Sequence, residues 1–420
     1  MKENKTKPDI RFKGFTDDWE QRKLSEVLIS LQNNTLSRVN LMSETGVAKN
    51  VHYGDVLIKF GDILDVSKEK LPMISDESIL KKYKASFLQN GDVIVADTAE
   101  DSSVGKCSEI IGLNDEIVLS GLHTIPYRPV EKFASGYLGY YLNSSAYHNQ
   151  LIPLMQGIKV MSISKSAMQN TYIIYPKLEE EQAKIGQYFS QLDNLITLHQ
   201  RECNQLKELK KTMLKKMFPR DGSNIPEVRF AGFTDDWEQR KLGELLEKYE
   251  DPVETPHDGY ERLGIRSHAK GTFHSFVESG EELNSARMHR VAANKFILNI
   301  TFAWEHAVAI TDKNDEGKLV SHRFPQFSFD KCLKSNFFKY LILDEKFRKH
   351  LELSSPGGAG RNRVLKISDM LEYKIYLPSI DEQTEIGQYF SHLDNLITLH
   401  QRELEILKNL KKTCLKRMFI

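Results

Sequence analysis

The sequence is poor in cysteine, and the cysteines that it has are scattered. There are four among 420 residues, Cys107, Cys203, Cys332 and Cys414, and no two of them form a C-x-x-C pair. Such spacing is typical of proteins in a reducing compartment, where disulfides are rare. We therefore expect no disulfide framework, and we expect the protein in the cytoplasm.

The chain also lacks long apolar runs and an excess of charge of one sign. No apolar stretch approaches the roughly 18–20 residues of a membrane-spanning helix, and the polar start MKENKTKPDI lacks the apolar core of a signal peptide. The 58 Lys and Arg residues balance the 58 Asp and Glu residues. We expect no association with a membrane, and any surface for a polyanionic partner has to come from local clusters of cations.

Motifs of the common enzyme families are missing as well. There is no G-x-x-x-x-G-K-[ST] phosphate loop, and the glycines from Gly357 to Gly360 do not have the spacing of a dinucleotide fingerprint. No G-x-S-x-G nucleophile turn is present. His199 and His400 fall on a helical seam, where a structural role is commoner than metal ligation. We expect no catalytic residues, no metal site and no cofactor bound by this chain.

What the sequence does contain is one long segment written twice. It starts at Glu180 as EEQAKIGQYFSQLDNLITLHQRE and returns at Asp381 as DEQTEIGQYFSHLDNLITLHQRE. In both copies apolar residues recur at alternating steps of three and four, which is the pattern of a coiled-coil seam. Each helix would be about 55–60 Å long at about 1.5 Å per residue. We predict two long helices, 179–218 and 381–420, that pair with each other.

A second repeated block precedes each helix at a distance. It starts at Ile10 as IRFKGFTDDWEQRKL and at Val228 as VRFAGFTDDWEQRKL. Each copy carries a pair of phenylalanines and a Thr-Asp-Asp run that has the character of a helix N-cap, so we expect a short helix around Trp19 and Trp237. A repeat of two blocks in the same order indicates tandem units.

The stretches between block and helix differ from each other in sequence. Both contain short β-branched runs bounded by Gly, Asp and Pro, such as GDVIVAD in the first and NKFILNITF in the second, which is typical of strands. Each then has a helical patch, a glycine-bearing loop and a strand that ends at Pro176 or Pro378. The predicted fold class is α+β: two mixed α/β domains in tandem, separated by two long helices that pair as a coiled coil, with pseudo-two-fold symmetry.

The repeats also set the expected domain boundaries, because Pro219 closes the first helix and a short polar linker follows it. The expected segments are a disordered tail (1–9), a first variable domain (10–178), a first long helix (179–218), a linker (219–227), a second variable domain (228–380) and a second long helix (381–420).

The order of these motifs resembles the specificity subunit of type I restriction-modification enzymes. An F-x-G-F-x-x-x-W-E-x-x-K-L block, a variable region, a run from proline into a helix and a basic helix end occur twice and cover the whole chain. The run reads PKLEEEQAKI in the first copy and PSIDEQTEI in the second, and the helix ends read KKTMLKKMF and KKTCLKRMF. One departure is Lys184, which Glu385 replaces in the second copy, so this position is not essential. The matching residues of the first copy are Phe12, Gly14, Phe15, Trp19, Glu20, Lys23, Leu24, Pro176, Glu181, Gln182, Ile185 and Lys210–Phe218.

The resemblance implies a DNA-recognition role without catalysis. Each variable region would be a target-recognition domain that reads one half of an asymmetric, bipartite site on double-stranded DNA. The helices would form an antiparallel coiled coil, which completes the predicted fold class and sets the spacing between the half-sites. They would also dock two modification subunits, which methylate adenine, and motor-nuclease restriction subunits would join them. S-adenosylmethionine, ATP and Mg are then expected on the partner subunits and not on this chain.

Other classes of protein remain as alternatives. A stand-alone regulator that binds a bipartite DNA site would bind tightly and function without any partner. A self-contained nuclease-methylase would need an N-P-P-Y or D-P-P-Y sequence, which this chain lacks. A coiled-coil scaffold would leave the two dissimilar variable regions unexplained.

Clusters of cations and polar residues in the variable regions give candidate DNA contacts. The basic stretch 262–295 and the glycine-rich loop 354–363 suit phosphate binding, and a solvated face or a plain loop is the alternative for each. The acidic stretch 97–101 either accepts a hydrogen bond from cytosine or orders a loop, and we favour the loop. The candidate DNA-binding residues are Lys49, Asn50, His52, Tyr53, Lys68, Lys70, Lys106, Lys159, Arg262, Arg266, His268, Lys270, Arg287, Arg290, Arg361 and Arg363.

The long helices carry more aromatic residues than a single seam needs. We predict that part of this surface docks a partner subunit. The candidate docking residues are Tyr188, Phe189, Tyr389 and Phe390.

Overall fold

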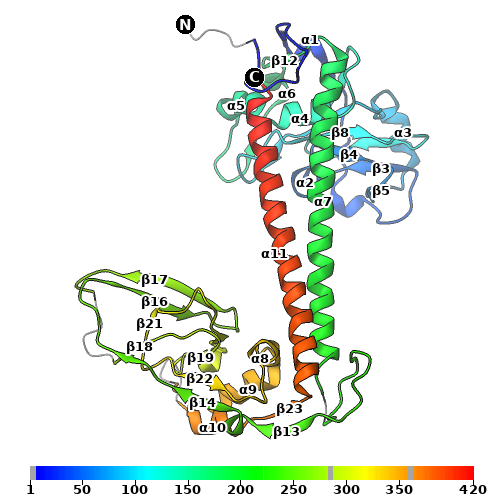
Figure 1. Ribbon diagram of the computed structural model, residues 1–420. Coiled ribbons are helices and arrows are strands. Elements are labelled where there is room, and N and C mark those ends of the chain that lie inside the picture. Colours follow the sequence, from blue (N-terminus) through cyan, green and yellow to red (C-terminus); the bar gives the residue numbers. More distant parts are fainter. Residues whose placement is uncertain (1–5, 221, 282–286, 358–362) are drawn as a thin grey trace. The chain divides into compact units, whose positions relative to one another are not determined.

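The computed structural model describes residues 6–220, 222–281, 287–357 and 363–420 (Figure 1). The chain forms two compact units. Unit 1 consists of residues 1–200 and 402–420, and unit 2 consists of residues 201–401. Each unit therefore contains one variable domain and a part of both long helices. In the described ranges, no helix is at once long and apolar enough to span a lipid bilayer.

The two predicted long helices are present. They are α7 (Glu179–Lys216) and α11 (Ile380–Arg417), each of 38 residues. Their buried apolar residues follow the alternating spacing of the predicted seam. In α11 these residues are Ile386, Phe390, Leu393, Ile397, Leu404 and Cys414, and Met418 follows directly after the helix.

Within each unit the start of one long helix lies beside the end of the other. In unit 1, Lys411 Nζ of α11 is 2.5 Å from Asp193 Oδ1 of α7. In unit 2, Lys210 Nζ of α7 is 2.5 Å from Asp394 Oδ1 of α11. Because start meets end in both units, the pairing is antiparallel, as the fold class predicted.

The variable domain of unit 1 is built around a five-stranded sheet with the order β2-β10-β6-β8-β4 and a three-stranded sheet with the order β5-β3-β9. Two small pairs, β1 with β12 and β7 with β11, complete its strands. The strands are β1 (Glu20–Lys23), β2 (Leu28–Ser30), β3 (Ala48–Val51), β4 (Ile63–Asp65), β5 (Met73–Ile74), β6 (Val93–Ala96), β7 (Thr98–Ala99), β8 (Cys107–Ile111), β9 (Val118–Ser120), β10 (Thr124–Pro129), β11 (Met161–Ser162) and β12 (Tyr172–Tyr175). The helices are α1 (Leu24–Val27), α2 (Tyr53–Ile58), α3 (Glu77–Tyr83), α4 (Tyr137–Asn143), α5 (Ser145–Leu151) and α6 (Lys165–Gln169), with short 3-10 turns η1 (Arg38–Asn40), η2 (Lys84–Ser86) and η3 (Ile152–Leu154).

The variable domain of unit 2 has other sheets, with the orders β14-β22-β19-β20 and β15-β18-β21-β16-β17, and the pair β13 with β23. The strands are β13 (Glu238–Lys241), β14 (Leu246–Tyr249), β15 (Pro252–Val253), β16 (Tyr260–Ile265), β17 (Thr272–Val277), β18 (Met288–Arg290), β19 (Phe296–Leu298), β20 (Val308–Ile310), β21 (Leu319–Ser321), β22 (Gln326–Phe329) and β23 (Lys374–Leu377). The helices are α8 (Ser335–Leu341), α9 (Glu345–Leu353) and α10 (Ile367–Leu371), with 3-10 turns η4 (Leu242–Glu244) and η5 (Ala303–Glu305).

The same buried ion pair joins the repeated block to the long helix in both units. Arg11 donates to both carboxylate oxygens of Glu181, at 2.7 and 2.8 Å. Arg229 makes the same pair of bonds to Glu382, at 2.8 and 2.7 Å. Both carboxylates are 1% exposed. Hydrogen bonding to the carboxylate raises the pKa of each arginine, so both guanidinium groups stay charged.

The prediction of a short helix around the two tryptophans is wrong. Trp19 and Trp237 lie in non-helical segments directly before β1 and β13. The following residues pair instead with the last strand of the variable domain, as Glu20 does with Tyr175. The N-cap character of the Thr-Asp-Asp run is a local preference, and strand pairing with a distant segment overrides it.

The end of the predicted disordered tail is held in place in unit 1. Thr6 accepts a hydrogen bond from the Trp19 backbone N–H at 3.0 Å, and the N–H of Ile10 donates to the carbonyl of Arg417 at 3.0 Å. In unit 2, Asn224 of the linker accepts from Trp237 in the same way, at 3.1 Å. Residues 1–5 lie outside the described part of the chain.

Candidate nucleic-acid interface

Two of the candidate lysines in unit 1 are engaged by the protein itself. Lys49 Nζ donates to the carbonyl of Val66 at 2.9 Å and lies 2.7 Å from Glu116. Lys106 Nζ donates to the carbonyl of Leu57 at 2.6 Å, and partial burial lowers the pKa of its ammonium group. Either lysine would have to break these bonds before it could contact DNA.

Asn50 is removed from the candidate set by the structure. It lies on β3, the central strand of its sheet, and it is 0% exposed. Its Oδ1 accepts a hydrogen bond of 2.6 Å from Asn34. The sequence did not reveal this burial, because a polar residue in a short strand gives no sign that both faces of the sheet are covered.

Other candidates in unit 1 gather with His123, which the sequence did not single out, and with Asp97 and Thr98 of the acidic stretch 97–101. The ring of His52 lies 4.7 Å from that of Tyr53, and Tyr53 meets His123 edge-on at 5.3 Å. His123 has a positive φ of 55°, and its Nδ1 lies 3.5 Å from Asp97 and 3.4 Å from the hydroxyl of Thr98. Non-glycine residues in this backbone region are strained and cluster at binding sites. Burial lowers the pKa of His52, so its ring is neutral at physiological pH.

Lys159 lies on a closed hairpin loop beside this cluster. Gln156 and Ser162 exchange two backbone hydrogen bonds of 2.9 and 2.8 Å, which close the loop. β11 then pairs with β7, which contains Thr98. Lys159 is exposed at the loop. The structure therefore brings Lys159 to the same strand pair as Thr98.

The remaining two lysines of unit 1 lie apart from this cluster, on exposed surface. Lys68 pairs with Asp65 at 2.7 Å, and Lys70 pairs with Glu44 at 3.2 Å. Exposed pairs of this kind are weak, so both side chains remain free to exchange partners.

In unit 2 the hairpin β16–β17 presents three candidates on one loop, residues 266–271. Arg266 stacks over the ring of Phe273 at 5.2 Å and donates to the carbonyl of Thr272. His268 and Lys270 are exposed on the same loop. A two-strand hairpin with cations at its turn has dimensions that fit a DNA groove.

The backbone of this loop is strained and held. His268 and Ala269 have positive φ values of 62° and 50°. Their N–H groups donate to the carbonyls of Glu305 and His306 at 2.9 and 2.8 Å. These two bonds keep the strained turn in one conformation, so its side chains are positioned before any ligand arrives.

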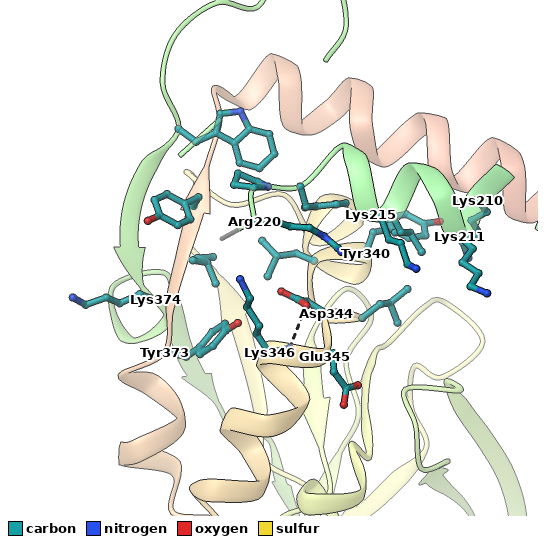
Figure 2. A pocket seen from close by; sticks show the side chains of 18 of the residues that line it. Lys210, Lys211, Lys215, Arg220, Tyr340, Asp344, Glu345, Lys346, Tyr373 and Lys374 are labelled. Atoms are coloured by element: carbon teal, nitrogen blue, oxygen red, sulfur yellow. Dashed lines mark hydrogen bonds between the residues drawn. The ribbon is translucent and has the colours of Figure 1, made fainter. Parts of the chain in front are cut away.

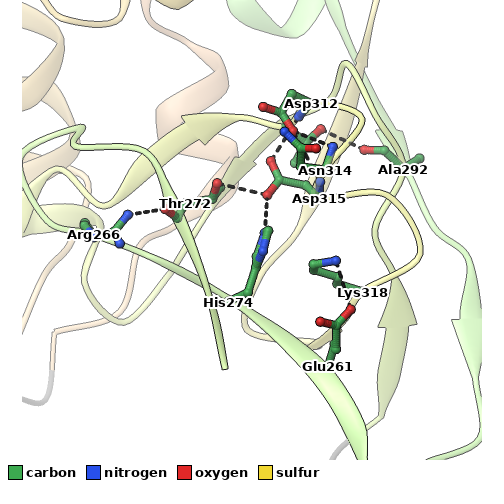
Figure 3. A network of polar contacts seen from close by, with 10 residues as sticks. Glu261, Arg266, Thr272, His274, Ala292, Asp312, Asn314, Asp315 and Lys318 are labelled. Carbon is green, nitrogen blue, oxygen red and sulfur yellow. Dashed lines mark hydrogen bonds and ion pairs between the residues drawn. The ribbon is translucent and has the colours of Figure 1, made fainter. Parts of the chain in front are cut away.

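A buried carboxylate fixes the base of the hairpin (Figure 3). Asp315 is 2% exposed, and its Oδ1 lies 2.7 Å from His274 Nε2 and 2.9 Å from the hydroxyl of Thr272. Its Oδ2 accepts from the backbone N–H of Asp312 at 3.0 Å. Beside it, Lys318 and Glu261 pair at 3.0 Å. The sequence did not single out Asp315, because its partners lie about 40 residues away in the chain.

The other candidates of unit 2 are surface arginines. Arg290 lies 4.0 Å from Asp251, and Arg363 lies 5.5 Å above the ring of Trp304. Arg262 and Arg287 are exposed. Arg361 lies outside the described residues.

Two of the four candidate docking residues are core residues and not surface residues. Phe189 and Phe390 are 0% exposed, and each stacks on a phenylalanine of the other long helix or its end, Phe419 and Phe218. They cannot contact a partner in this conformation, because the coiled-coil seam covers them.

Tyr188 and Tyr389 remain partly exposed. Each meets a phenylalanine of the repeated block edge-on, Phe12 at 6.0 Å and Phe230 at 5.8 Å. A hydrogen bond to the Cys414 thiol, together with burial, raises the pKa of Tyr188 to about 12. These two tyrosines keep the docking prediction open.

The family model described as the type I restriction modification DNA specificity domain matches this chain twice, over residues 16–208 and 234–409. The two matches include most of the sequence, and each contains a variable domain and a long helix. This chain therefore belongs to that family, and the resemblance noted in its sequence is confirmed.

Individual proteins that are described as specificity subunits of type I restriction enzymes are also similar to this chain. The chain is 26% identical over 272 residues to the type I restriction enzyme MjaVIII specificity subunit of Methanocaldococcus jannaschii, which covers 61% of this chain and 63% of the relative. It is 24% identical over 424 residues to a putative MjaX specificity subunit of the same organism, with 94% and 91% covered. The crystal structure of a type I restriction-modification S subunit from M. genitalium matches 99% of both chains, with a TM-score of 0.57 and 13% identity. That likeness supports the α+β tandem fold alone.

Proposed function

We propose that this protein is the sequence-specific DNA-recognition subunit of a type I restriction-modification complex. Each variable domain reads one half of an asymmetric, bipartite site, and the long helices set the distance between the halves. One observation carries this proposal. The repeated blocks that start at Ile10 and Val228 and the two long helices together form what we call the frame. Its contacts, such as Arg11 with Glu181 and Arg229 with Glu382, occur twice, whereas the sheets of the two variable domains differ. A common frame with two different readers suits a site whose halves differ.

The loop geometry supports DNA reading. In unit 1 the strained His123 lies with Tyr53, Thr98 and the loop of Lys159. In unit 2 the strained loop 266–271 carries three candidates. Cations position a protein on phosphates, and polar or aromatic side chains held rigidly beside them can read base edges.

The proposal extends to partners and location. We propose that two modification subunits dock on the long helices at Tyr188 and Tyr389, and that motor-nuclease restriction subunits join the complex in the cytoplasm. The methylation and cleavage chemistry belongs to those subunits, with S-adenosylmethionine, ATP and Mg bound there and no cofactor on this chain.

Adenine methylation in a methylation-free host tests the reader role. This chain is expressed with its cognate modification subunit, and the modification subunit alone is the control. We expect methylated adenines at one asymmetric split motif, and only when this chain is present. If the two proteins co-purify and the modification subunit is competent, yet no motif is methylated, the reader role is rejected and a stand-alone DNA-binding regulator becomes the better account.

Matched loop variants assign the halves of the motif. His268→Ala with Lys270→Ala should relax or abolish one half only, and Tyr53→Ala with Lys159→Ala the other half only. Loss of both halves from either variant would contradict independent readers.

Docking is tested separately. Tyr188→Ala with Tyr389→Ala should weaken co-purification with the modification subunit while the urea midpoint of unfolding stays the same, because both side chains lie partly exposed on the frame. Unchanged co-purification would reject this docking site.

A further inference from the structure

Unit 2 contains a cavity of about 490 Å³ at the C-terminal end of α7 (Figure 2). Its apolar floor includes Phe218, Trp237, Leu341 and Ile375. The volume lies in the range of ligand pockets, which are lined mainly by apolar and aromatic side chains with a few polar groups at the edge.

The cavity exists because a leucine stands where unit 1 has a tyrosine. Tyr140 and Tyr340 are equivalent, since each donates its hydroxyl at 2.9 Å to an equivalent aspartate of the long helices. The next residue in unit 1, Tyr141, is 0% exposed, and its hydroxyl accepts a hydrogen bond of 2.8 Å from the backbone of Ile174 on β12. In unit 2 the next residue is Leu341, whose shorter side chain leaves the corresponding space beside β23 empty.

Cations surround the opening of this cavity. Lys207, Lys211 and Lys215 line it at intervals of four residues, so they form a stripe along one side of α7 that is about 12 Å long. Arg220, Lys346 and Lys374 line it from other segments, against only two carboxylates, Asp344 and Glu345. In the close-up, the lysines of α7 and Lys374 lie on opposite sides of the cavity (Figure 2).

The helix dipole does not explain this stripe. Cations near a helix C-terminus are stabilising only within the last turn, and Lys207 lies more than two turns before the end of α7 at Lys216. Lys211 and Lys215 form no ion pair with a carboxylate in the described parts of the chain. By contrast, Lys210 is held by Asp394. The stripe therefore has uncompensated positive charge beside an apolar cavity.

We propose that this cavity binds an acidic peptide segment of a partner protein. A large apolar side chain of the segment enters the space beside Leu341, and flanking Asp and Glu side chains meet the lysine stripe. The length of the stripe favours a peptide over a compact anion. Cations that are spread over about 12 Å cannot all contact one phosphate group, which reaches only two or three of them. The inference rests on the proposed function in one respect, that the partner is a subunit of the same complex.

One consequence is that the two copies of the frame are not equivalent docking surfaces. The lysines themselves are repeated in unit 1 as Lys408, Lys412 and Lys416. There, however, Tyr141 fills the space for an anchoring side chain. Charge is thus common to both copies. A pocket of about 480 Å³ also lies beside Lys412 and Lys416, but its other lining residues, Asp9, Thr413 and Arg417, are polar, so the apolar lining distinguishes unit 2.

The test uses the full chain and a fluorescein-labelled synthetic peptide in which Asp and Glu flank a central Trp-Leu pair. Fluorescence anisotropy should show saturable binding of one peptide per chain. Leu341→Tyr should weaken it about tenfold by filling the cavity. Lys211→Glu with Lys215→Glu should weaken it by a similar factor and reduce its dependence on salt. The matched control, Lys412→Glu with Lys416→Glu, carries the same charge change in unit 1 and should bind as the parent does.

Several results would overturn the proposal. These are the absence of saturable binding, equal binding by the Leu341→Tyr variant, or equal binding of a peptide with Ala-Ala in place of Trp-Leu. Displacement of the peptide by ATP at equal concentration, but not by tripolyphosphate, would assign the cavity to a nucleotide instead. The methylation motif of the Leu341→Tyr variant separates this inference from DNA reading. An unchanged motif together with lost peptide binding supports the inference. Peptide binding by a protein that directs no methylation motif would support the peptide site and reject the reader role.

Discussion

The same lysine of the long helices has different surroundings in the two units. In unit 1, Lys411 lies 2.5 Å from Asp193 on the facing helix and 2.7 Å from Asp62 of the variable domain. In unit 2, the equivalent Lys210 pairs with the equivalent Asp394 alone among the described carboxylates. Burial acts to lower the pKa of Lys411, but the two aspartates outweigh it and the net pKa is raised.

This difference shows how one frame can carry two unrelated readers. Contacts inside the frame, such as Arg11 with Glu181, join the repeated block to the long helix and are the same in both units. Contacts from the frame to the variable domain are added locally, as Asp62 is for Lys411, and they can be present in one unit only. A new variable domain therefore needs to satisfy few fixed partners.

The largest expected loss of stability comes from breaking the buried arginine–glutamate pair, which is the same in both units. Glu181→Ala leaves Arg11 with a buried, unpaired charge, so unit 1 should lose about 3–5 kcal/mol of unfolding free energy. Glu382→Ala should lower the stability of unit 2 by a similar amount. Urea unfolding followed by hydrogen exchange of each unit measures both. A large effect in one unit and none in the other would show that the frame is not energetically symmetric.

The second largest effect is a dependence of the stability of unit 1 on pH, which comes from Glu109. Burial raises the pKa of Glu109 to about 7 from its ordinary value of 4.5, although its carboxylate accepts backbone hydrogen bonds from Gly136 and Gly139 at the start of α4. The folded state therefore binds more protons than the unfolded chain between pH 4.5 and 7, and stability falls as pH rises through this window, by about 3 kcal/mol.

Glu109→Gln should remove this slope, because glutamine does not titrate. Urea midpoints of unit 1 at a series of pH values measure it, with unit 2 of the same molecule as internal reference. A slope that persists in the variant would assign the pH dependence to another group.

An intermediate effect is specific to unit 2. Asp315→Asn removes the charge that holds His274 and Thr272, so the base of the β16–β17 hairpin should lose about 2 kcal/mol. Hydrogen exchange of the hairpin and the methylation motif report the result. The half-site read by unit 2 should lose definition and the other half should stay unchanged. A change in both halves would contradict the separate roles of the units.

The smallest effects come from replacing Lys411 in unit 1 and the equivalent Lys210 in unit 2. Lys411→Met leaves Asp62 and Asp193 without their shared cation and should cost about 2 kcal/mol. Lys210→Met removes a single ion pair and should cost about 1 kcal/mol. Thermal unfolding of the two variants side by side gives the difference. Equal costs would mean that Asp62 contributes nothing to the binding of Lys411.

Sequence reasoning succeeded where the signal was periodic or repeated. The spacing of apolar residues predicted both long helices and their pairing with each other, since such spacing depends only on the period of a helix. The antiparallel direction came from the family resemblance, because apolar spacing does not set direction. It failed at Trp19 and Trp237, where a cap-like run precedes a strand, because a partner strand about 150 residues away decides the local structure. Burial of Asn50 was missed for the same reason, because the sequence of a short strand does not show whether that strand lies at the centre of its sheet.

The candidate interface could be predicted only as a set of residue types. The cations of loop 266–271 were visible in the sequence, but the strain at His123 and the support from Asp315 depend on backbone geometry and distant partners. The cavity of unit 2 depends on Leu341 standing where Tyr141 stands in unit 1. The variable domains share almost no sequence, so this equivalence emerges only from their contacts with the long helices.

The division of unit 1 between the two ends of the chain has a consequence for biosynthesis. Phe419, from its last residues, packs edge-on against Trp19 and stacks on Phe189, so the core of unit 1 stays incomplete until residues 402–420 leave the ribosome. Unit 2 is continuous, residues 201–401, and can close first. During translation the N-terminal half therefore exposes part of its apolar core until these residues are made, and exposed apolar surface of this kind favours aggregation and chaperone binding.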